Sequence, residues 1–192
     1  MSRLRLPAAL LALAALALPA AARAQSAPRL EVGLTYGSSS AHDNDAVHDR
    51  YASAGAFVRA FFVPLPVGTL GLAASGERVL ANSTYRLDSF TLGPAFRFAP
   101  VRGLEVGLAA QGGSYHSGPD GTADWFGTGA LDLSVGTRFG AFGVAATGRH
   151  GWVFGVPGRY ACPAMGEDCA PAPDQTDDYT RIGLEVSVAL GR

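Results

Sequence analysis

Residues 125–139 read WFGTGALDLSVGTRF, and apolar and polar side chains alternate along this stretch. Successive side chains of a β-strand point to opposite faces, so a period of two sorts them onto two sides. One side carries Leu131, Leu133, Val135 and Phe139, and the other carries Thr128, Asp132, Ser134 and Arg138. This pattern predicts a strand that separates an apolar environment from a polar one.

The same alternation recurs along the rest of the chain. It predicts eight strands, at 29–37, 51–63, 69–79, 86–99, 104–115, 125–139, 142–156 and 179–190. Each is long enough for the ~9 to 11 residues that cross a bilayer as a tilted strand. One soluble sheet could show such alternation, but eight strands in sequence without a helix favour a barrel.

The connections between these strands alternate in length. Three are tight, at 64–68, 100–103 and 140–141, and four are longer and polar, at 41–50, 80–85, 117–124 and 157–178. Short periplasmic turns and long external loops are typical of outer-membrane barrels. The sequence therefore predicts an all-β fold, an eight-stranded antiparallel transmembrane β-barrel of the outer-membrane type, with loops 41–50 and 157–178 outside the cell.

The first residues have the features of a secretory signal. Arg3 and Arg5 precede an apolar stretch over 8–18, and Ala22-Arg23-Ala24 supplies small residues for cleavage. We expect a signal peptide over 1–24 and one barrel domain over 25–192. No later apolar run reaches the ~18 residues of a membrane-spanning helix. The predicted location is the outer membrane of a double-membraned, Gram-negative bacterium.

Charge and cysteine content bear on two further properties, nucleic-acid binding and the state of the cysteines. The basic residues are all arginine, and after the predicted cleavage twelve arginines face sixteen acidic residues, a net charge of −4. An acidic chain argues against a nucleic-acid partner. Two cysteines in an exported chain are read as a disulfide rather than a metal pair, so we expect Cys162 to be bonded to Cys169.

Aromatic residues gather at both ends of the predicted strands. The long-loop ends carry Tyr36, Tyr51, Tyr85, Tyr115, Trp125, Trp152, Tyr160 and Tyr179, and the tight-turn ends carry Phe61, Phe62, Phe96, Phe98, Phe139 and Phe142. Two such groups are expected as girdles at the two interfaces of a membrane. A secreted barrel that binds an apolar ligand is the alternative, but it would turn its apolar face inward and need no girdles.

Over Arg29 to Arg192 the chain resembles the small eight-stranded outer-membrane barrels of the OmpA/OmpX-like group in architecture. The resemblance implies a monomer surrounded by outer-membrane lipid and lipopolysaccharide, with the barrel assembly machinery as a partner. Members of this group typically end on an aromatic residue that this machinery reads. The present sequence ends Leu190-Gly191-Arg192, which departs from that pattern.

Charged residues of both signs share the polar parity of the strands. The predicted lumen residues are Glu31, Glu77, Glu105, Asp132 and Glu185 with Arg59, Arg97, Arg138, Arg149 and Arg181. The tight turns place Arg97 opposite Glu105 and Asp132 opposite Arg149, and the longer loop places Glu31 near Arg59. A bore of eight strands has room only for side chains, so we expect ion pairs to fill it. A narrow, gated, porin-like channel is the alternative.

Two further groups of residues are candidates for functional sites. Ser114 and His116 share the outward parity, and the hairpin register brings Asp88 beside them, an arrangement a hydrolase could use. Lipid A deacylase barrels carry such residues in the order His-x-Ser, which is reversed here, and polar residues are ordinary at an interface. The segment His42-Asp43-Asn44-Asp45 with His48 and Asp49 lacks the spacing of a calcium loop. We therefore predict no enzyme activity, no metal site and no cofactor, and a structural or surface-interaction role.

The disulfide gives a direct test. A bridge between Cys162 and Cys169 closes a short loop and stabilises the fold by roughly 2 to 3 kcal/mol. A peptide map of the exported protein without reductant should contain the two cysteines in one cross-linked fragment. Two free thiols in that map would refute the bridge.

Overall fold

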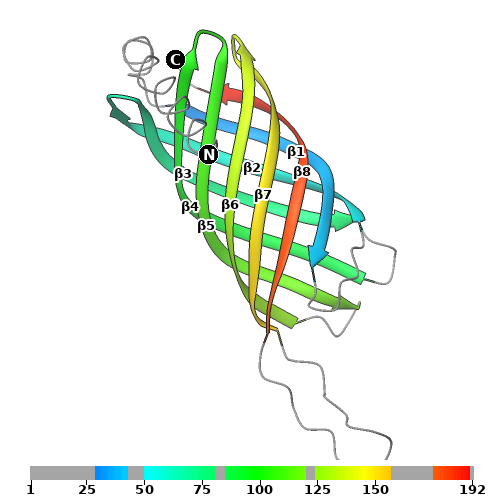
Figure 1. The fold of residues 1–192 in the computed structure, drawn as a ribbon. Helices are drawn as coiled ribbons and strands as arrows, with labels where there is room; N and C mark the ends of the chain where they lie inside the picture. Colours follow the sequence, from blue (N-terminus) through cyan, green and yellow to red (C-terminus); the bar gives the residue numbers. More distant parts are fainter. Residues whose placement is uncertain (1–28, 43–49, 81–84, 120–123, 157–174, 191–192) are drawn as a thin grey trace, which may run out of the picture.

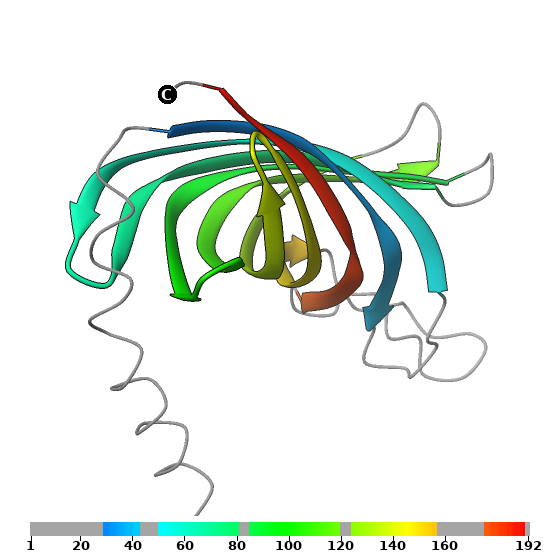
Figure 2. The same ribbon diagram turned by 90° about the horizontal axis from the view of Figure 1, so that it is seen from above.

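The computed structural model describes residues 29–42, 50–80, 85–119, 124–156 and 175–190. They form eight antiparallel strands: β1 (Arg29–His42), β2 (Arg50–Leu65), β3 (Gly68–Leu80), β4 (Tyr85–Val101), β5 (Leu104–Pro119), β6 (Asp124–Phe139), β7 (Phe142–Val156) and β8 (Gln175–Leu190). Each strand pairs with its neighbours in the chain, and β1 pairs with β8 to close the barrel (Figures 1 and 2). The predicted eight-stranded antiparallel barrel is confirmed.

The strands run further toward the long loops than the side-chain pattern predicted. β5 continues to Pro119 and β8 begins at Gln175, whereas alternation was evident only to residue 115 and from 179. Backbone N–H and C=O groups pair in a ladder whatever side chains they carry, so polar sequence does not end a strand whose neighbours are in place.

The tight turns and the strand ends near the chain termini lie at one end of the barrel (Figure 1). Gly103 and Gly140 sit in the β4–β5 and β6–β7 turns with φ of +86° and +62°, a conformation that favours glycine. The β6–β7 turn is also tied to the last strand, because Ala189 N–H donates to the carbonyl oxygen of Ala141 (2.8 Å). This end is called the turn end below, and the opposite end the loop end.

The distribution of side chains is the inverse of that in a soluble protein. Large apolar residues stand on the outer wall, where Ile182 is 72% exposed and Leu131 53%. Polar and charged residues point into the barrel, where Asp132 is 8% exposed and Arg149 3%. The parity read from residues 125–139 therefore holds in the fold, since Leu131, Leu133, Val135 and Phe139 are outside and Thr128, Asp132 and Ser134 inside.

Two inward glycines make room for aromatic rings. A Cβ on Gly33 would lie 2.4 Å from the ring of Phe57, and one on Gly151 would lie 2.2 Å from the ring of Tyr179. Both rings are buried, so any larger residue at these glycines would displace them. Each ring therefore lies over a glycine directly opposite it on the neighbouring strand, a strand position that has no side chain of its own.

The aromatic girdles need correction. Tyr36, Trp125, Phe62, Phe139 and Phe142 are exposed on the outer wall, in agreement with the girdle interpretation. Phe61 and Tyr179, by contrast, are buried inside the barrel, and Tyr115 stacks on Tyr179 with ring centroids 5.8 Å apart. Position along a strand does not by itself determine the face on which a ring lies, and parity places Tyr115 on the inward side with Gln111.

Several sequence predictions concern residues outside the described ranges. These are the signal peptide over 1–24, the disulfide between Cys162 and Cys169, and most of the long loops. Across the strands that the structure describes, there is no helix long and apolar enough to span a membrane.

The ladder around Gly71 gives a test of the fold. A bulge between Phe61 and Val63 shifts the register beside Gly71, and a Cβ on Gly71 would lie 1.9 Å from the carbonyl oxygen of Ala60. Gly71→Val must push the two strands apart, so we expect a loss of ~1 to 3 kcal/mol in the free energy of unfolding.

The matched control is Gly127→Val on β6, where the nearest atom to a new Cβ is 3.9 Å away. Valine suits a strand better than glycine, so this variant should unfold in urea at or above the wild-type midpoint. Equal midpoints for the two variants would contradict the register at Gly71.

Candidate functional site

Charged side chains fill the inside of the barrel from end to end. Among the described residues the interior holds six arginines and five acids, namely Arg29, Arg59, Arg97, Arg138, Arg149 and Arg181 with Glu31, Glu77, Glu105, Asp132 and Glu185. All ten residues predicted for the lumen lie there, and Arg29 is the eleventh. They form three groups along the barrel.

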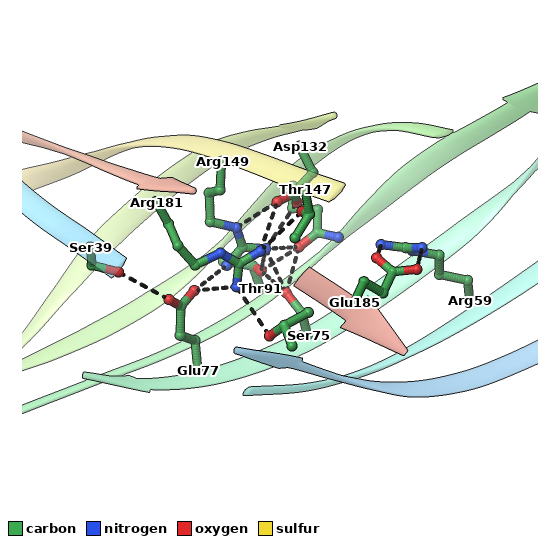
Figure 3. A network of polar contacts seen from close by, with 12 residues as sticks. Ser39, Arg59, Ser75, Glu77, Thr91, Asp132, Thr147, Arg149, Arg181 and Glu185 are labelled. Carbon is green, nitrogen blue, oxygen red and sulfur yellow. Dashed lines mark hydrogen bonds and ion pairs between the residues drawn. The ribbon is translucent and has the colours of Figure 1, made fainter. Parts of the chain in front are cut away.

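The first group, here called the loop-side cluster, consists of Arg149, Arg181, Glu77 and Asp132 (Figure 3). Asp132 lies directly opposite Arg149 in the β6–β7 ladder. The guanidinium of Arg149 donates a hydrogen bond to each oxygen of this carboxylate, from Nε to Oδ1 (2.7 Å) and from Nη2 to Oδ2 (2.9 Å). Bidentate, charge-assisted pairs of this kind are among the strongest hydrogen-bonded contacts in proteins.

Neutral side chains complete the surroundings of Arg149. Its Nη2 donates to Ser75 Oγ (2.6 Å) on β3, as Figure 3 shows, and to Gln111 Oε1 (2.9 Å) on β5. Thr91 hydrogen-bonds to the same glutamine oxygen. Thr91 on β4 also lies 3.3 Å from Arg149 Nη2. One guanidinium therefore links β7 to β3, β4, β5 and β6, and only its contact with Asp132 is to the neighbouring strand.

Arg181 extends this cluster toward the loop end. Its Nη1 donates to Glu77 Oε2 (3.0 Å) and to Thr35 Oγ1 (3.2 Å). Glu77 also lies 3.5 Å from Arg149 Nη1 and accepts a hydrogen bond from Ser39 (3.4 Å). Two arginines thus share two carboxylates, and the cluster has no net charge.

The second group is a single pair in the middle of the barrel, between Arg59 on β2 and Glu185 on β8 (Figure 3). The pair is bidentate, with both N···O distances 2.7 Å. The guanidinium also lies 4.1 Å from the ring centroid of Phe57, a cation–π contact.

The third group, here called the turn-side cluster, gathers around Glu31. This carboxylate is 3% exposed and pairs with Arg97, with Arg138 (2.6 Å) and with Arg29 (3.1 Å). Arg29 and Arg138 also reach Glu105, at 3.4 and 3.3 Å. With three arginines and two glutamates this cluster carries one positive charge in excess. The guanidinium of Arg97 lies over the ring of buried Phe61, at 4.2 Å.

Of the three predicted ion pairs, Asp132 with Arg149 forms, and the other two are replaced by different pairs. Arg97 lies opposite Gly107, not Glu105, because β4 stays paired through Val101 and a bulge between Phe98 and Val101 shifts the two strands. Arg97 pairs instead with Glu31 across the interior. Glu31 does lie opposite Arg59 in the β1–β2 ladder, but the guanidinium of Arg59 forms its ion pair with Glu185. Ladder register alone therefore does not determine which charges meet.

Sequence reasoning missed some partners in the interior. Arg29 was not assigned to the lumen, although it shares the parity of Glu31, two residues away. Ser75 and Thr91 carry no charge that would mark them in the sequence. The bond from Ser75 to Gln111, and those from Arg149 to Ser75 and Thr91, join strands that are not neighbours. Only the closed barrel brings these groups together.

Two small cavities lie among these side chains. One of about 40 Å³ is lined by residues that include Glu31, Arg59 and Glu105, and one of about 20 Å³ is lined by Glu77, Tyr115 and Tyr179 among others. A water molecule needs roughly 10 to 15 Å³ by this measure. These spaces suit a few water molecules rather than an organic ligand.

On the outer wall, the Ser114, His116 and Asp88 group is arranged differently from a catalytic triad. Asp88 lies opposite His116 in the ladder, as the sequence suggested, but its two oxygens accept hydrogen bonds from Arg78 (2.7 and 2.9 Å). The ring of His116 packs against Trp125, with centroids 4.6 Å apart. Within the residues that the structure describes, no cluster of three or more His, Cys, Asp or Glu is arranged to hold a metal ion.

Comparisons with known proteins find similarity in structure and not in sequence. No protein-family model matches the chain, and no curated protein sequence matches it. The crystal structure of Neisserial surface protein A is similar with a TM-score of 0.52 and 12% identity, over 84% of this chain and 96% of that one. Ail, the attachment invasion locus protein of Yersinia pestis, in complex with the heparin analogue sucrose octasulfate, gives a TM-score of 0.50 and 11% identity, over 85% and 99%.

At such low identity the likeness extends to the fold alone. The neighbours span nearly their whole lengths on the barrel described here, and both are small barrels of the type predicted from the sequence. The chain therefore has the fold of the small eight-stranded outer-membrane β-barrels.

Proposed function

We propose that this chain is an outer-membrane barrel with a structural or surface-interaction role, whose lumen is closed by ion pairs. The main observation in support is that apolar residues face outward and charged residues face inward, the reverse of a soluble protein. Apolar residues such as Leu34, Leu184 and Phe139 stand on the outside at 61 to 68% exposure, where water would disfavour them and acyl chains would not. The predicted signal peptide supports export to that membrane.

The interior supports the closed-lumen part of the proposal. A bore of eight strands is just wide enough for side chains to fill. Here the filling is charged, and each charge meets an opposite one on another strand, as in the Arg149–Asp132 and Arg59–Glu185 pairs. Ions would have to break these buried pairs to pass, so the lumen supports the wall rather than conducting.

Surface interaction would be the task of the long loops. Their sequences are rich in acids, with Asp43, Asp45, Asp49, Asp120, Asp124, Glu167, Asp168, Asp174, Asp177 and Asp178. The structurally similar Ail binds a polyanionic heparin analogue in its crystal. Acidic loops would repel such a ligand, so the partners we propose for this chain are neutral or cationic surfaces.

The buried pair of Arg149 and Asp132 gives the first test. Arg149→Ala removes both guanidinium hydrogen bonds of Asp132, which then keeps only Arg181 at 4.0 Å, and breaking a buried charge pair in this way typically costs ~3 to 5 kcal/mol. The variant should therefore lose its compact, fast-migrating form in gel electrophoresis at a clearly lower temperature than wild type.

Two controls accompany this variant. Arg78→Ala removes the pair with Asp88 on the outer wall, where Arg78 is well exposed, and should melt near the wild-type temperature. Exchanging the residues at 132 and 149 should restore only part of the stability, because Ser75 and Gln111 would no longer meet a guanidinium from β7. An Arg149→Ala barrel as heat-resistant as wild type would refute the ion-paired lumen.

A small porin-like channel is the second candidate, because charges of both signs line the bore. The closed lumen predicts no steady, large conductance when the purified barrel is inserted into planar bilayers. Channels of nanosiemens scale that vanish on heat denaturation of the protein would make the channel the leading function.

A lipid-modifying hydrolase is the third candidate. It would need Ser114 as the nucleophile and His116 as the base, with Asp88 to orient the histidine. Both oxygens of Asp88 accept hydrogen bonds from Arg78, which competes with any role in orienting the histidine. We therefore expect that expression of either wild type or Ser114→Ala leaves the acyl chains of lipid A intact. A change in the lipid A mass spectrum that depends on Ser114 would overturn this expectation.

A further inference from the structure

The outer wall carries an apolar groove of about 620 Å³, much larger than the cavities inside the barrel. It follows two neighbouring rows of outward residues that cross the strands. The row nearer the turn end is Leu108, Leu133, Gly148 and Ile182, and the row nearer the loop end is Ala110, Leu131, His150 and Thr180. The groove is open along the wall rather than enclosed, and apolar atoms make up nearly all of its lining.

Small residues among large ones create this groove. Gly148 lies between Leu133 and Ile182 in its row, and the nearest atom to a Cβ placed on it would be the carbonyl oxygen of Arg181, 3.9 Å away. The neighbouring Leu133 and Ile182 are exposed, so they stand on either side of an open strip of backbone. Ala110 adds little bulk in the adjacent row.

One end of the groove is polar. His150 and Thr180 face each other across the β7–β8 ladder, with Nδ1 and Oγ1 3.2 Å apart. The imidazole also meets the ring of Trp152 edge-on, with centroids 4.6 Å apart. These contacts orient the ring of His150, which lines the groove.

We propose that the groove binds an acyl chain of a glycolipid in the external leaflet, with His150 hydrogen-bonding to an oxygen at the head of the chain. This inference rests on the outer-membrane location proposed above. Because β7 runs from the turn end to the loop end, His150 lies on the external side of Leu133 and Gly148, one row beneath Trp152. An apolar slot with a single polar end matches an ester- or amide-linked acyl chain, which has one polar linkage and a long apolar tail.

The test uses intact-protein mass spectrometry of the detergent-solubilised barrel with added synthetic lipid A. Wild type should bind one lipid A molecule, and Gly148→Leu, which fills the groove, should bind none. His150→Phe keeps a ring against Trp152 but removes the hydrogen bond, so its binding should weaken about fivefold. Gly127→Leu is the matched control, because Gly127 is also an outward, open strand glycine but does not line the groove, and it should bind as wild type does.

Other results would overturn the inference. Equal lipid A binding by all four proteins, or equal binding of phosphatidylethanolamine by wild type, would mean a general lipid coat. A dimer mass that Gly148→Leu abolishes would assign the groove to a second copy of the chain. Insertion into liposomes, measured by heat-dependent gel mobility, distinguishes failure of the groove inference from failure of the outer-membrane proposal. Barrels that insert but do not bind lipid A selectively refute only the groove. A wild type that never inserts refutes the outer-membrane proposal.

Discussion

The narrow bore is the constraint on which the rest of this structure depends. Eight strands closed by the β1–β8 ladder enclose a space that side chains almost fill, and the small cavities left among them have room for too little water to screen a charge well. Every charge placed inside must therefore meet an opposite charge or a polar group. Arg149 meets this requirement through contacts with Asp132, Ser75, Gln111 and Thr91. These contacts join five strands, β3 to β7, around one guanidinium.

Closure also explains why the outer wall is apolar. The ladders satisfy the backbone of all eight strands without help from solvent, so the wall can stand in an apolar medium. Side chains outside then need only match that medium, and they vary in size. Where small residues such as Gly148 and Ala110 fall among leucines, the wall is hollowed, and the groove with His150 at its end results.

The interior and the wall suggest different roles. The interior is occupied by its own side chains, with spaces suited to a few water molecules, which favours a supporting role. The wall offers a larger space with an oriented histidine. These two features are the basis for proposing a role at the wall and the loops rather than transport through the lumen.

The sequence by itself determined the number of strands, the two faces of the wall and ten of the eleven described charges inside, all but Arg29, because a period of two assigns each side chain to a face before any tertiary contact forms. It also placed Asp132 opposite Arg149, since the two-residue β6–β7 turn leaves no freedom in register. Only the tertiary structure decided that Arg97 meets Glu31 and that Arg59 meets Glu185. Long guanidinium side chains reach across a closed bore to strands that are distant in sequence, and a bulge such as that after Phe98 shifts the ladder by a step that alternation does not reveal.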